Sequence, residues 1–415
     1  MINHDIVVVG GGPAGMAAAI AAYDNGVRDV VILDREKNLG GILQQCIHNG
    51  FGLHKFGEEL TGPEYANIYS KKVAERGIEV YNETTVTDIS KEKIITATNS
   101  NGILKIKAKA VILAMGCRER SRGALNIAGT RPAGIYSAGT AQKLINCEGY
   151  SVGERVVILG SGDIGLIMAR RMTLEGAKVE AVCELMSYSG GLTRNIVQCL
   201  NDFNIPLYLS TTVVEIHGEE RLEGVTVAKV DSKNQILEDT KRYIPCDTLL
   251  LSVGLIPENE LTRSIGIELN NITNGAEVNQ NRQSNIDGVF ACGNVLHVHD
   301  LVDYVSDESE IAGKSAAKYV NGQLSGGKEI DVKAENGIRY VLPQKINLEN
   351  TEDIALLMRV DKPYDRVQIT VKAGEVILAN VKRIRAVPGE MEKIIIKKEG
   401  LVNICDSITV GLEEI

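Results

Sequence analysis

The sequence predicts an α/β fold in which two domains of one design are followed by a small all-β domain. A short apolar run leads into a glycine-rich turn and a helix of small residues at the start of the chain, and the same pattern returns at 155–165. Alternating apolar runs separated by Pro and Gly occupy 330–415, which is typical of short strands. With 415 residues the chain is long enough for these domains.

The opening turn has the form of a dinucleotide-binding fingerprint. Residues 5–15 read Asp-Ile-Val-Val-Val-Gly-Gly-Gly-Pro-Ala-Gly, and a second apolar run ends on Asp34. We expect Gly10 to permit the tight turn, and Gly12 to let the backbone approach a pyrophosphate. Gly15 would let the helix pack close to the strand. The helix N-terminus then offers free N–H groups to the pyrophosphate, and Asp34 can accept hydrogen bonds from a ribose.

A second copy of this pattern predicts a second domain of Rossmann-like design. Residues 155–165 read Arg-Val-Val-Ile-Leu-Gly-Ser-Gly-Asp-Ile-Gly, and the following strand ends on Glu184. The spacing from Gly160 to Glu184 equals the spacing from Gly10 to Asp34. Each copy closes with a buried strand and a glycine, at 110–116 and at 247–254. Internal repetition of this kind indicates two dinucleotide-binding domains.

The segments between these landmarks are expected to be β-rich, with 118–150 connecting the two copies. We predict small antiparallel meanders from the runs at 78–81, 85–89, 94–97, 207–209, 212–216 and 225–230. A further strand at 288–294 ends on Gly293-Asn294. Ser306 is the predicted N-cap of a helix that runs to about Asn321, before a glycine-rich linker at 322–327.

The last predicted domain carries no evident chemistry. Its strands are expected at 355–360, 366–372, 376–384 and 393–398. It contains no His and one Cys, Cys405. We therefore expect a lid or a docking module for a partner, without catalytic groups.

Composition excludes several classes of protein. The apolar content of 44% and charged content of 24% are those of a soluble globular chain. A net charge of −9 without a basic block argues against nucleic acid or an anionic membrane as partner. No apolar run is long enough for a membrane span or a signal peptide. The eight cysteines show no C-x-x-C spacing, which favours reduced thiols in a cytoplasm over disulfides or a zinc site.

The two fingerprints together with Gly293-Asn294 resemble the flavoprotein family with two dinucleotide-binding domains, which includes glutathione and thioredoxin reductases. The resemblance implies FAD at the first fingerprint, NAD(H) at the second, and insertion of the second domain into the first. It predicts an FAD domain at 1–118 and 255–327, an NAD(H) domain at 119–254, and a β-rich domain at 328–415. The helix near Ser306 would then aim its N-terminus at the flavin. The implied cofactor contacts are Gly10, Gly12, Pro13, Ala14, Gly15, Asp34, Arg35, Gly41, Val86, Ala114, Gly116, Gly160, Gly162, Asp163, Ile164, Gly165, Glu184, Gly254, Gly293 and Asn294.

Residues 116–142 carry a closer likeness, with Gly-Cys-Arg-Glu-Arg-Ser-Arg-Gly at the start and Arg-Pro-Ala-Gly-Ile-Tyr-Ser-Ala-Gly-Thr-Ala-Gln at the end. This stretch is similar to the flavin subunits of opine oxidases, hydrogen cyanide synthase and sarcosine oxidase. The likeness implies electron transfer with a partner dehydrogenase of the amino-acid or glycerol-phosphate type. It leaves the substrate, the direction of electron flow and a possible homo-oligomer open.

The sequence departs from the family at several points. Asn294 stands where an Asp is usual, and Leu166-Ile167-Met168 follows the second fingerprint where many members place a Glu near the nicotinamide. No iron–sulfur cysteine cluster and no His beyond His299 are present. At the second acid, Leu185 and Met186 offer no cation to a 2′-phosphate, so we predict NADH over NADPH.

Cys46 and His48 are the candidate catalytic residues. They lie in the stretch that carries a redox cysteine pair in the disulfide reductases, but Cys46 has no second cysteine within ten residues. A lone thiolate whose pKa His48 lowers could support peroxide-type chemistry in a stand-alone NADH oxidase or peroxidase, or a reductase of a small acceptor. The alternative is a packed thiol lining the flavin site.

The other candidates are a histidine pair and two further cysteines. His297 and His299, followed by Asp300, could bind metal or face the flavin edge, although solvated loop residues are the commoner case. Cys117 and Cys292 are expected at buried strand ends, where they would be inert.

Overall fold

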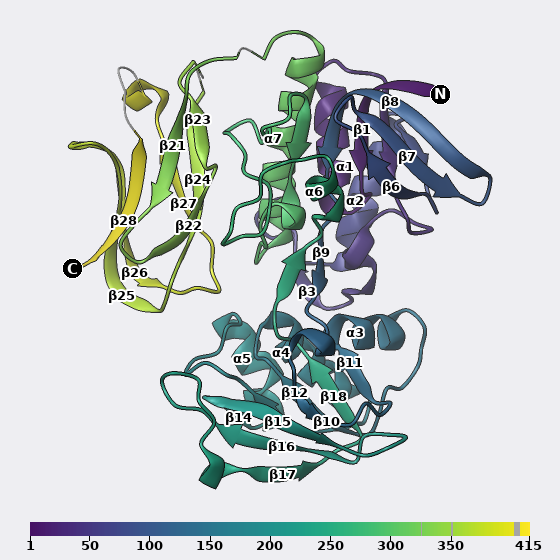
Figure 1. Ribbon diagram of the computed structural model, residues 1–415, viewed down its shortest axis with the longest axis vertical. Helices are drawn as coiled ribbons and strands as arrows, with labels where there is room; N and C mark the ends of the chain where they lie inside the picture. The colour runs from purple at the N-terminus through teal and green to yellow at the C-terminus, as the bar shows by residue number, and fades with distance from the viewer. Residues whose placement is uncertain (325, 350–351, 402–406) are drawn as a thin grey trace. The chain divides into compact units, whose positions relative to one another are not determined.

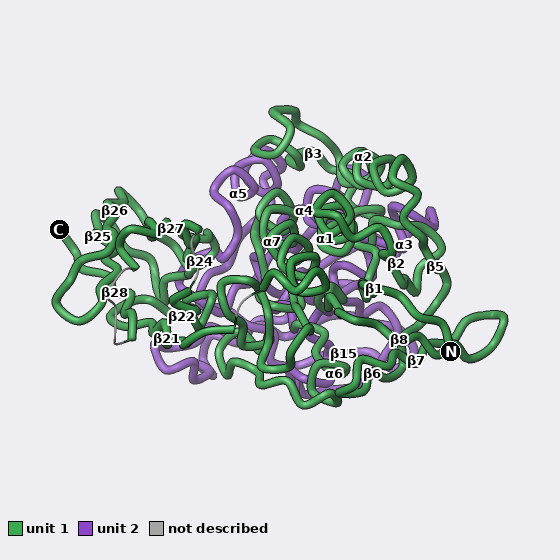
Figure 2. The backbone as a smooth tube through the Cα atoms, turned by 90° about the horizontal axis from the view of Figure 1, so that it is seen from above, with its two compact units in different colours: residues 1–117, 257–415 green, residues 118–256 purple. Residues whose placement is uncertain are grey.

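The chain divides into two compact units, of which the second is inserted into the sequence of the first. The computed structural model describes residues 1–324, 326–349, 352–401 and 407–415 (Figure 1). One unit comprises 1–117 and 257–415, and the other comprises 118–256 (Figure 2). The chain passes between them within β9 (Cys117–Glu119) and β19 (Leu255–Pro257). Cys405 and part of the 322–327 linker lie outside the described residues.

The first unit is built on a mostly parallel sheet with the order β5-β2-β1-β8-β7-β6, and β20 also pairs with β8. β1 lies between β2 and β8, parallel to both, and its last residues Ile6–Val9 are buried. A run buried on both faces is typical of a central parallel strand. The strands are β1 (Ile2–Val9), β2 (Val30–Leu33), β5 (Glu79–Tyr81), β6 (Thr85–Ile89), β7 (Ile94–Asn99), β8 (Gly102–Leu113) and β20 (Val289–Ala291).

Two helices with small residues at their contact pack against this sheet. α1 (Pro13–Asp24) is rich in alanine, and α7 (Val302–Val320) brings Gly313 against it. A Cβ on Gly313 would lie 2.1 Å from the Ala18 carbonyl oxygen, so this approach requires glycine. The unit also contains η1 (Gly41–Gln45), β3 (Asn49–Phe51), β4 (Leu60–Thr61), α2 (Gly62–Glu75), α6 (Glu260–Ser264) and η5 (Gly293–Val295).

The predicted start of the last long helix is wrong. α7 begins at Val302, with Leu301 as its N-cap, and Ser306 lies inside the helix. The Ser306 side chain is fully buried, and its hydroxyl lies 2.7 Å from the Tyr65 hydroxyl. Because this hydroxyl is used in a tertiary contact, Ser306 is a packing residue and not a cap.

The inserted unit repeats the design of the first. Its parallel sheet has the order β11-β18-β12-β13-β14, and an antiparallel hairpin set, β15-β16-β17, carries β10 at its edge. The helix α4 follows β12 directly. The elements are η2 (Arg122–Ala124), β10 (Ala128–Gly129), β11 (Ile135–Ser137), α3 (Ala138–Asn146), β12 (Arg155–Leu159), α4 (Asp163–Leu174), β13 (Lys178–Cys183), α5 (Thr193–Cys199), η3 (Asn201–Phe203), β14 (Leu207–Tyr208), β15 (Thr211–His217), β16 (Gly224–Lys229), η4 (Glu238–Thr240), β17 (Arg242–Pro245) and β18 (Thr248–Leu251).

Two runs assigned to the antiparallel meanders belong elsewhere. β5, expected at 78–81, pairs in parallel with β2, and β14, expected at 207–209, pairs in parallel with β13. Each follows a helix, α2 or α5, which returns the chain across the sheet and so sets a parallel direction. The antiparallel pairs begin only at β6 and β15.

The C-terminal part of the first unit is rich in strands, as predicted. Its two sheets have the orders β23-β21-β28-β25-β26 and β22-β24-β27, and they enclose their own apolar core. The four expected runs correspond to β24, β25, β26 and β27, whereas the other four strands were not predicted. The elements are β21 (Glu329–Ala334), β22 (Ile338–Leu342), β23 (Lys345–Asn347), β24 (Ile354–Val360), β25 (Tyr364–Ala373), β26 (Val376–Ala386), β27 (Glu392–Ile396), η6 (Lys398–Leu401) and β28 (Ile408–Glu414).

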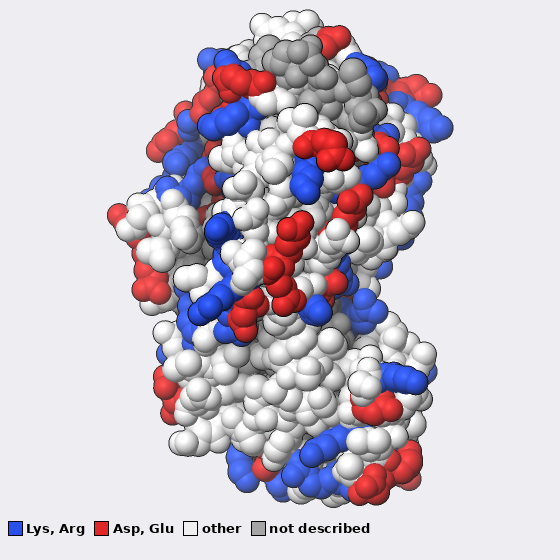
Figure 3. All heavy atoms as spheres, turned by 90° about the vertical axis from the view of Figure 1, so that its left-hand side faces the viewer, with Lys and Arg blue, Asp and Glu red and all other residues white. Residues whose placement is uncertain are grey.

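Charges of both signs are distributed over the surface. On the face presented in Figure 3, lysine and arginine alternate with aspartate and glutamate, and neither sign forms a continuous block. In the part of the chain that is described, no helix combines the length and apolarity that crossing a membrane would need.

Candidate dinucleotide sites and a buried charge cluster

The fingerprint glycines at the start of the chain differ in what surrounds them. Gly10 has φ +107, and a Cβ there would lie 2.4 Å from the Ala114 carbonyl oxygen. A Cβ on Gly15 would lie 1.8 Å from the Gly10 carbonyl oxygen. Gly12, which precedes Pro13 at the N-terminus of α1, has an ordinary φ of −72, and its Cβ would meet no described atom within 4 Å. Gly10 and Gly15 are therefore required by the fold, whereas Gly12 borders open space.

Asp34 is positioned to hold the fingerprint loop. Its carboxylate is 6% exposed and accepts the N–H of Gly11 and, at 2.7 Å, the N–H of Glu36. Burial raises the pKa of Asp34 above its ordinary value. The neighbouring Arg35 side chain is exposed and lies 4.0 Å from Glu36.

Two other segments of the first unit converge on the N-terminus of α1. Gly41 has φ +53, and its Cβ would lie 3.2 Å from the Gly12 Cα. From the other side, a Cβ on Gly293 would lie 2.7 Å from the Ala14 Cβ. The fold therefore brings the 40–41 turn and the 293–294 turn together at the first fingerprint, as the sequence predicted.

Asn294 has a defined orientation in this turn. Its Oδ1 accepts the backbone N–H of His299 at 3.0 Å, and its Nδ2 donates to the Cys117 sulfur at 3.6 Å. Cys117 is half-buried rather than buried, contrary to the prediction. Cys292 is fully buried, and burial raises its pKa to about 12, which suits an inert thiol.

Two predicted contacts lie outside this convergence. Val86 is a half-buried residue of β6 that pairs with Ala97. Gly116 has φ +73, and its carbonyl accepts the N–H of Glu258.

The second fingerprint reproduces the first in detail. A Cβ on Gly160 (φ +101) would lie 2.0 Å from the Ser252 carbonyl oxygen, and one on Gly165 would lie 2.4 Å from the Gly160 carbonyl oxygen. A Cβ on Gly162 would meet no described atom within 4 Å. Glu184 accepts the backbone N–H of Ser161 at 2.9 Å, as Asp34 accepts that of Gly11.

The remaining residues predicted at the second site have separate surroundings. The Asp163 carboxylate accepts the Leu192 N–H at 2.8 Å and the Asn195 side-chain amide at 2.6 Å, so it holds the loop before α5. Ile164 is half-buried against the core. Gly254 has φ +104, and its carbonyl accepts the N–H of Arg120.

Cys46 and His48 lie just after η1, the short helix that Gly41 opens. The Cys46 thiol donates to the Ile42 carbonyl oxygen at 3.3 Å, and its carbonyl accepts the N–H of Gly62. The His48 ring packs against Phe51, with 5.1 Å between centroids. Redox activity of Cys46 stays a prediction.

A buried cluster of charged and polar groups lies behind the 293–294 turn. Glu308 on α7 is 2% exposed, and its carboxylate accepts from Arg282 Nε at 3.1 Å and from the Gly293 N–H at 3.0 Å. His297 Nε2 lies 3.1 Å and His299 Nε2 lies 3.4 Å from the same carboxylate. Both histidines are buried, so the expectation of solvated loop residues is wrong.

Electrostatics favour an ion-pair cluster over a metal site. Although burial raises it, His297, His299 and Arg282 together hold the pKa of Glu308 well below its usual range. Burial, with neighbouring His297, lowers the pKa of His299 to about 3. The ligand atoms of His297, His299 and Glu308 lie within 4.8 Å of one another and could surround a cation. However, Arg282 already supplies a positive charge to that carboxylate, so a second cation would be repelled.

The β-rich region contributes directly to this cluster. The Tyr340 hydroxyl on β22 lies 3.3 Å from His297 Nδ1. Arg359 on β24 donates to the Val298 carbonyl oxygen at 3.0 Å and lies 3.4 Å from the Asp300 carboxylate. These contacts hold the 297–300 loop that leads into α7. Sequence reasoning missed Arg282, Tyr340 and Arg359, because no local pattern links three polar residues so far apart in the chain.

Comparison with known proteins identifies the family. The family model for pyridine nucleotide-disulphide oxidoreductases matches residues 4–311. The chain therefore belongs to this family, and it is an FAD-dependent oxidoreductase that uses NAD(P)H.

Individual relatives refine the picture. The chain is 28% identical over 315 residues to the HcnB subunit of hydrogen cyanide synthase from Pseudomonas protegens, covering 70% of this chain and 65% of that protein. It is 24% identical over 288 residues to one of the subunits of opine oxidase from Agrobacterium tumefaciens, covering 64% and 55%. Both alignments thus leave a third or more of the relative unmatched. The fold is similar to that of T. acidophilum thioredoxin reductase, with a TM-score of 0.63, 23% identity, and coverage of 77% and 99%.

The geometry of both fingerprints fits the cofactors of this family. Each has open space over its middle glycine, at the N-terminus of a helix without a side-chain cap. Such a helix end leaves backbone N–H groups for a pyrophosphate. The individual contacts with FAD and NAD(H) stay predictions.

Proposed function

We propose that this chain is the flavin-carrying electron-transfer subunit of a multi-subunit dehydrogenase of the amino-acid or glycerol-phosphate type. Hydride would pass between NAD(H) and FAD, and electrons would pass between FAD and a partner subunit. The names of two relatives support this proposal, because both are subunits of larger oxidases or synthases.

The cysteine pattern carries the proposal. A reduced flavin must be emptied, and disulfide reductases do this through a cysteine pair beside the flavin. Here the nearest cysteine in the sequence to Cys46 is Cys117. No disulfide bond joins any of the seven cysteines in the described part of the chain. The exit is then a small acceptor or a partner with its own redox centre, and the subunit relatives favour the partner.

FAD, when bound, would supply the redox chemistry, and the first unit would hold it. The α1 N-terminus at Gly12 would face the pyrophosphate, Asp34 would accept ribose hydroxyl hydrogen bonds, and Asn294 would contact the ribityl or pyrophosphate part. The N-terminus of α7 at Val302 would place its dipole toward the flavin and favour negative charge there.

NAD(H) would be held by the second unit in the same way. The α4 N-terminus at Gly162 would face the pyrophosphate, and Glu184 would accept the adenosine ribose hydroxyls. Because Glu184 is already anionic, it would repel a 2′-phosphate at the same position. We therefore propose NADH as the preferred nucleotide.

Anaerobic titration with NADH tests the proposal. NADH should bleach the flavin of the purified chain, while turnover with oxygen or peroxide stays slow. Adding the co-purifying partner should restore rapid reoxidation. Cys46→Ser should leave each of these rates unchanged.

The second candidate is a stand-alone NADH oxidase or peroxidase, or a reductase of a small acceptor, that uses Cys46. It is favoured by one observation, that Cys46 ends the short helix whose first residue, Gly41, contacts Gly12. Rapid peroxide or oxygen turnover by the isolated chain, lost in Cys46→Ser, would establish this alternative in place of the first.

A further inference from the structure

Residues 122–131 form a closed loop on the inserted unit that the nucleotide fingerprint does not use. Arg122 Nη2 donates to the Thr130 carbonyl oxygen at 2.6 Å, and the Thr130 hydroxyl donates to the Gly218 carbonyl oxygen. Gly129 has φ +102, and a Cβ there would lie 2.1 Å from the Ile216 carbonyl oxygen. The loop is therefore fixed to β15 at a position where only glycine fits.

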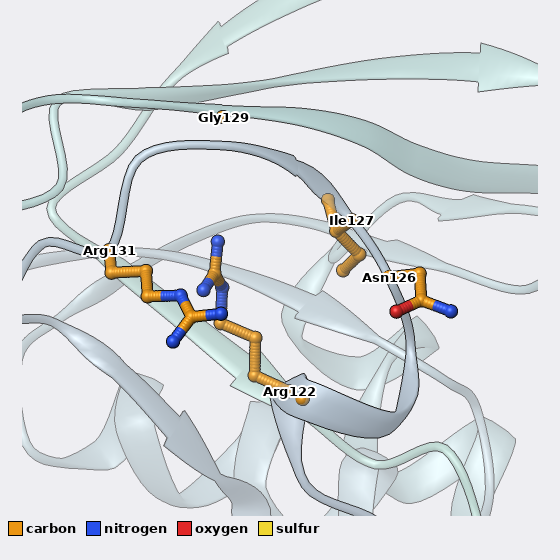
Figure 4. Close-up of a pocket in the computed structure, with 6 residues that line it drawn as sticks. Arg122, Asn126, Ile127, Gly129 and Arg131 are labelled. Atoms are coloured by element: carbon orange, nitrogen blue, oxygen red, sulfur yellow. The ribbon is translucent and has the colours of Figure 1, made fainter.

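This loop encloses a hollow of about 260 Å³ that is lined by Arg122, Gly123, Asn126, Ile127, Gly129 and Arg131 (Figure 4). The side chains of Arg122 and Arg131 enter it from different parts of the loop. Their guanidinium groups lie next to each other inside the arch of the backbone (Figure 4). Two planar cations thus share one small concave space.

The positive charge in this hollow is not balanced by the described protein. Neither Arg122 nor Arg131 forms an ion pair among the residues that are described. Residues 118–131 contain four arginines and one acid, Glu119, whose carboxylate accepts the Gly139 N–H at 2.8 Å. Adjacent like charges repel, and the repulsion is relieved by an anion between them.

Arg122 also has an unused donor. Its Nε is shielded from solvent and has no hydrogen-bond acceptor in the described part of the chain. Shielded donors of this kind are rare in folded proteins, because an unmet donor costs free energy. An anion reached by a small shift of the exposed Arg131 side chain would satisfy it.

We propose that this loop binds an oxoanion of the phosphate type, carried by a small phosphorylated metabolite. Guanidinium forks match the oxygen spacing of phosphate and bind it through paired hydrogen bonds. The Asn126 side chain lies at the rim (Figure 4) and can add a donor. A hollow of about 260 Å³ has room for more than the phosphate group alone.

The site is separate from the predicted nucleotide site of the same unit. None of the residues lining it belongs to the second fingerprint at 160–165, and Glu184 is not among them. The inference therefore does not depend on the proposed electron-transfer function, and NADH provides an independent control.

Calorimetric titration of the FAD-loaded full chain with inorganic phosphate, at fixed ionic strength, tests the proposal. We expect saturable binding that Arg131→Gln weakens by about tenfold or more, since a charge-assisted hydrogen bond is lost. Arg122→Gln should have the same effect, but it also opens the loop, so Arg131→Gln is the decisive variant. Arg170→Gln, an exposed arginine on α4, should leave phosphate binding unchanged.

Competition experiments define the ligand class. Saturating NADH should not alter the affinity for phosphate, and acetate should bind far more weakly than phosphate. The proposal is overturned by any of four results: no phosphate binding, unchanged binding in Arg131→Gln, displacement of phosphate by NADH, or acetate binding as tightly as phosphate.

Discussion

At the scale of single residues, the fingerprint glycines fall into two groups that mutation should separate. Gly15 and Gly165 are packed against backbone, whereas Gly12 and Gly162 border open space with ordinary φ values. A side chain at the first group must displace the backbone. A side chain at the second group only fills the space where the pyrophosphate is expected.

Gly12→Val should therefore give a folded but colourless protein. The valine is accommodated by the fold and blocks the approach of the pyrophosphate. Gly15→Val should instead lower the yield of folded protein, because its Cβ would overlap the Gly10 carbonyl. Far-ultraviolet circular dichroism and the bound FAD content measure the two effects. Gly162→Val is the matched control, which should keep FAD and lose reduction by NADH. Full FAD in Gly12→Val would refute the assignment of the first fingerprint.

Glu184 should decide between the two nucleotides. Its carboxylate accepts hydrogen bonds from Ser161 and from the Met186 N–H at 2.9 Å, so it is fixed beside the turn. A 2′-phosphate near this charge would cost on the order of a few kcal/mol. In stopped-flow experiments NADH should reduce the flavin much faster than NADPH, and Glu184→Gln should narrow the difference. Equal rates in the wild-type protein would contradict the preference.

At the scale of elements, one cluster joins the 293–301 loop, α7 and the strands β22 and β24. Glu308 balances Arg282 inside the protein, and both side chains are at most 2% exposed. Removing one partner of a buried ion pair leaves the other uncompensated, at a cost of about 3–5 kcal/mol. Glu308→Gln should therefore lower the free energy of unfolding, measured by denaturant titration, and loosen the turn that carries Asn294.

The same cluster predicts how stability depends on pH. The pKa of His299 is lowered to about 3 in the folded protein, whereas an unfolded histidine titrates near its ordinary value of 6.5. The unfolded state therefore binds the extra proton first. This contribution to stability is complete above pH 6.5 and is lost as the pH falls toward 3, by up to about 1.4 kcal/mol per pH unit.

Denaturant unfolding of the wild type and of His299→Gln at several pH values would measure this effect. The slope below pH 6.5 should be shallower in His299→Gln. His54→Gln, which alters an exposed histidine, is the control and should keep the wild-type slope. An unchanged slope in His299→Gln would show that this histidine is not buried in its neutral form.

At the scale of the whole molecule, sequence patterns predicted what is local or repeated. The two fingerprints, the acids that follow them and the strand-rich C-terminal region could be found because each is a short pattern of glycine, apolar and acidic positions. The buried state of His297 and His299 could not be found in this way, since it depends on Arg282, Tyr340 and Arg359 from distant strands. The start of α7 was misplaced because Ser306 resembles a cap but is used in a tertiary contact.

This cluster also changes how a partner-docking role of residues 328–415 can be tested. Tyr340 and Arg359 hold the loop beside the predicted flavin site, so deleting 328–415 would uncover the buried charges. Loss of FAD after such a deletion would then reveal nothing about docking. A substitution on the outer surface of this region is the sharper experiment.

The edge strand β26 offers that surface. It pairs only with β25 in its sheet, and it carries Ile377, which is 54% exposed, and Ile384, which is 87% exposed. An exposed apolar edge strand next to the cations Lys382 and Arg385 is a suitable contact for an acidic partner strand. We expect Ile384→Asp to leave FAD content and reduction by NADH unchanged, and to slow electron transfer to the partner subunit.

Ile103→Asp is the matched control for this last prediction. Ile103 is 74% exposed and lies on β8 of the first unit, outside the β-rich region. The measurement is the rate at which the NADH-reduced chain passes electrons to its partner, with co-purification as a second readout. If Ile384→Asp and Ile103→Asp transfer electrons equally well, β26 is not the docking edge. If only Ile384→Asp is slow, while both retain FAD, the β-rich region docks the partner through this strand.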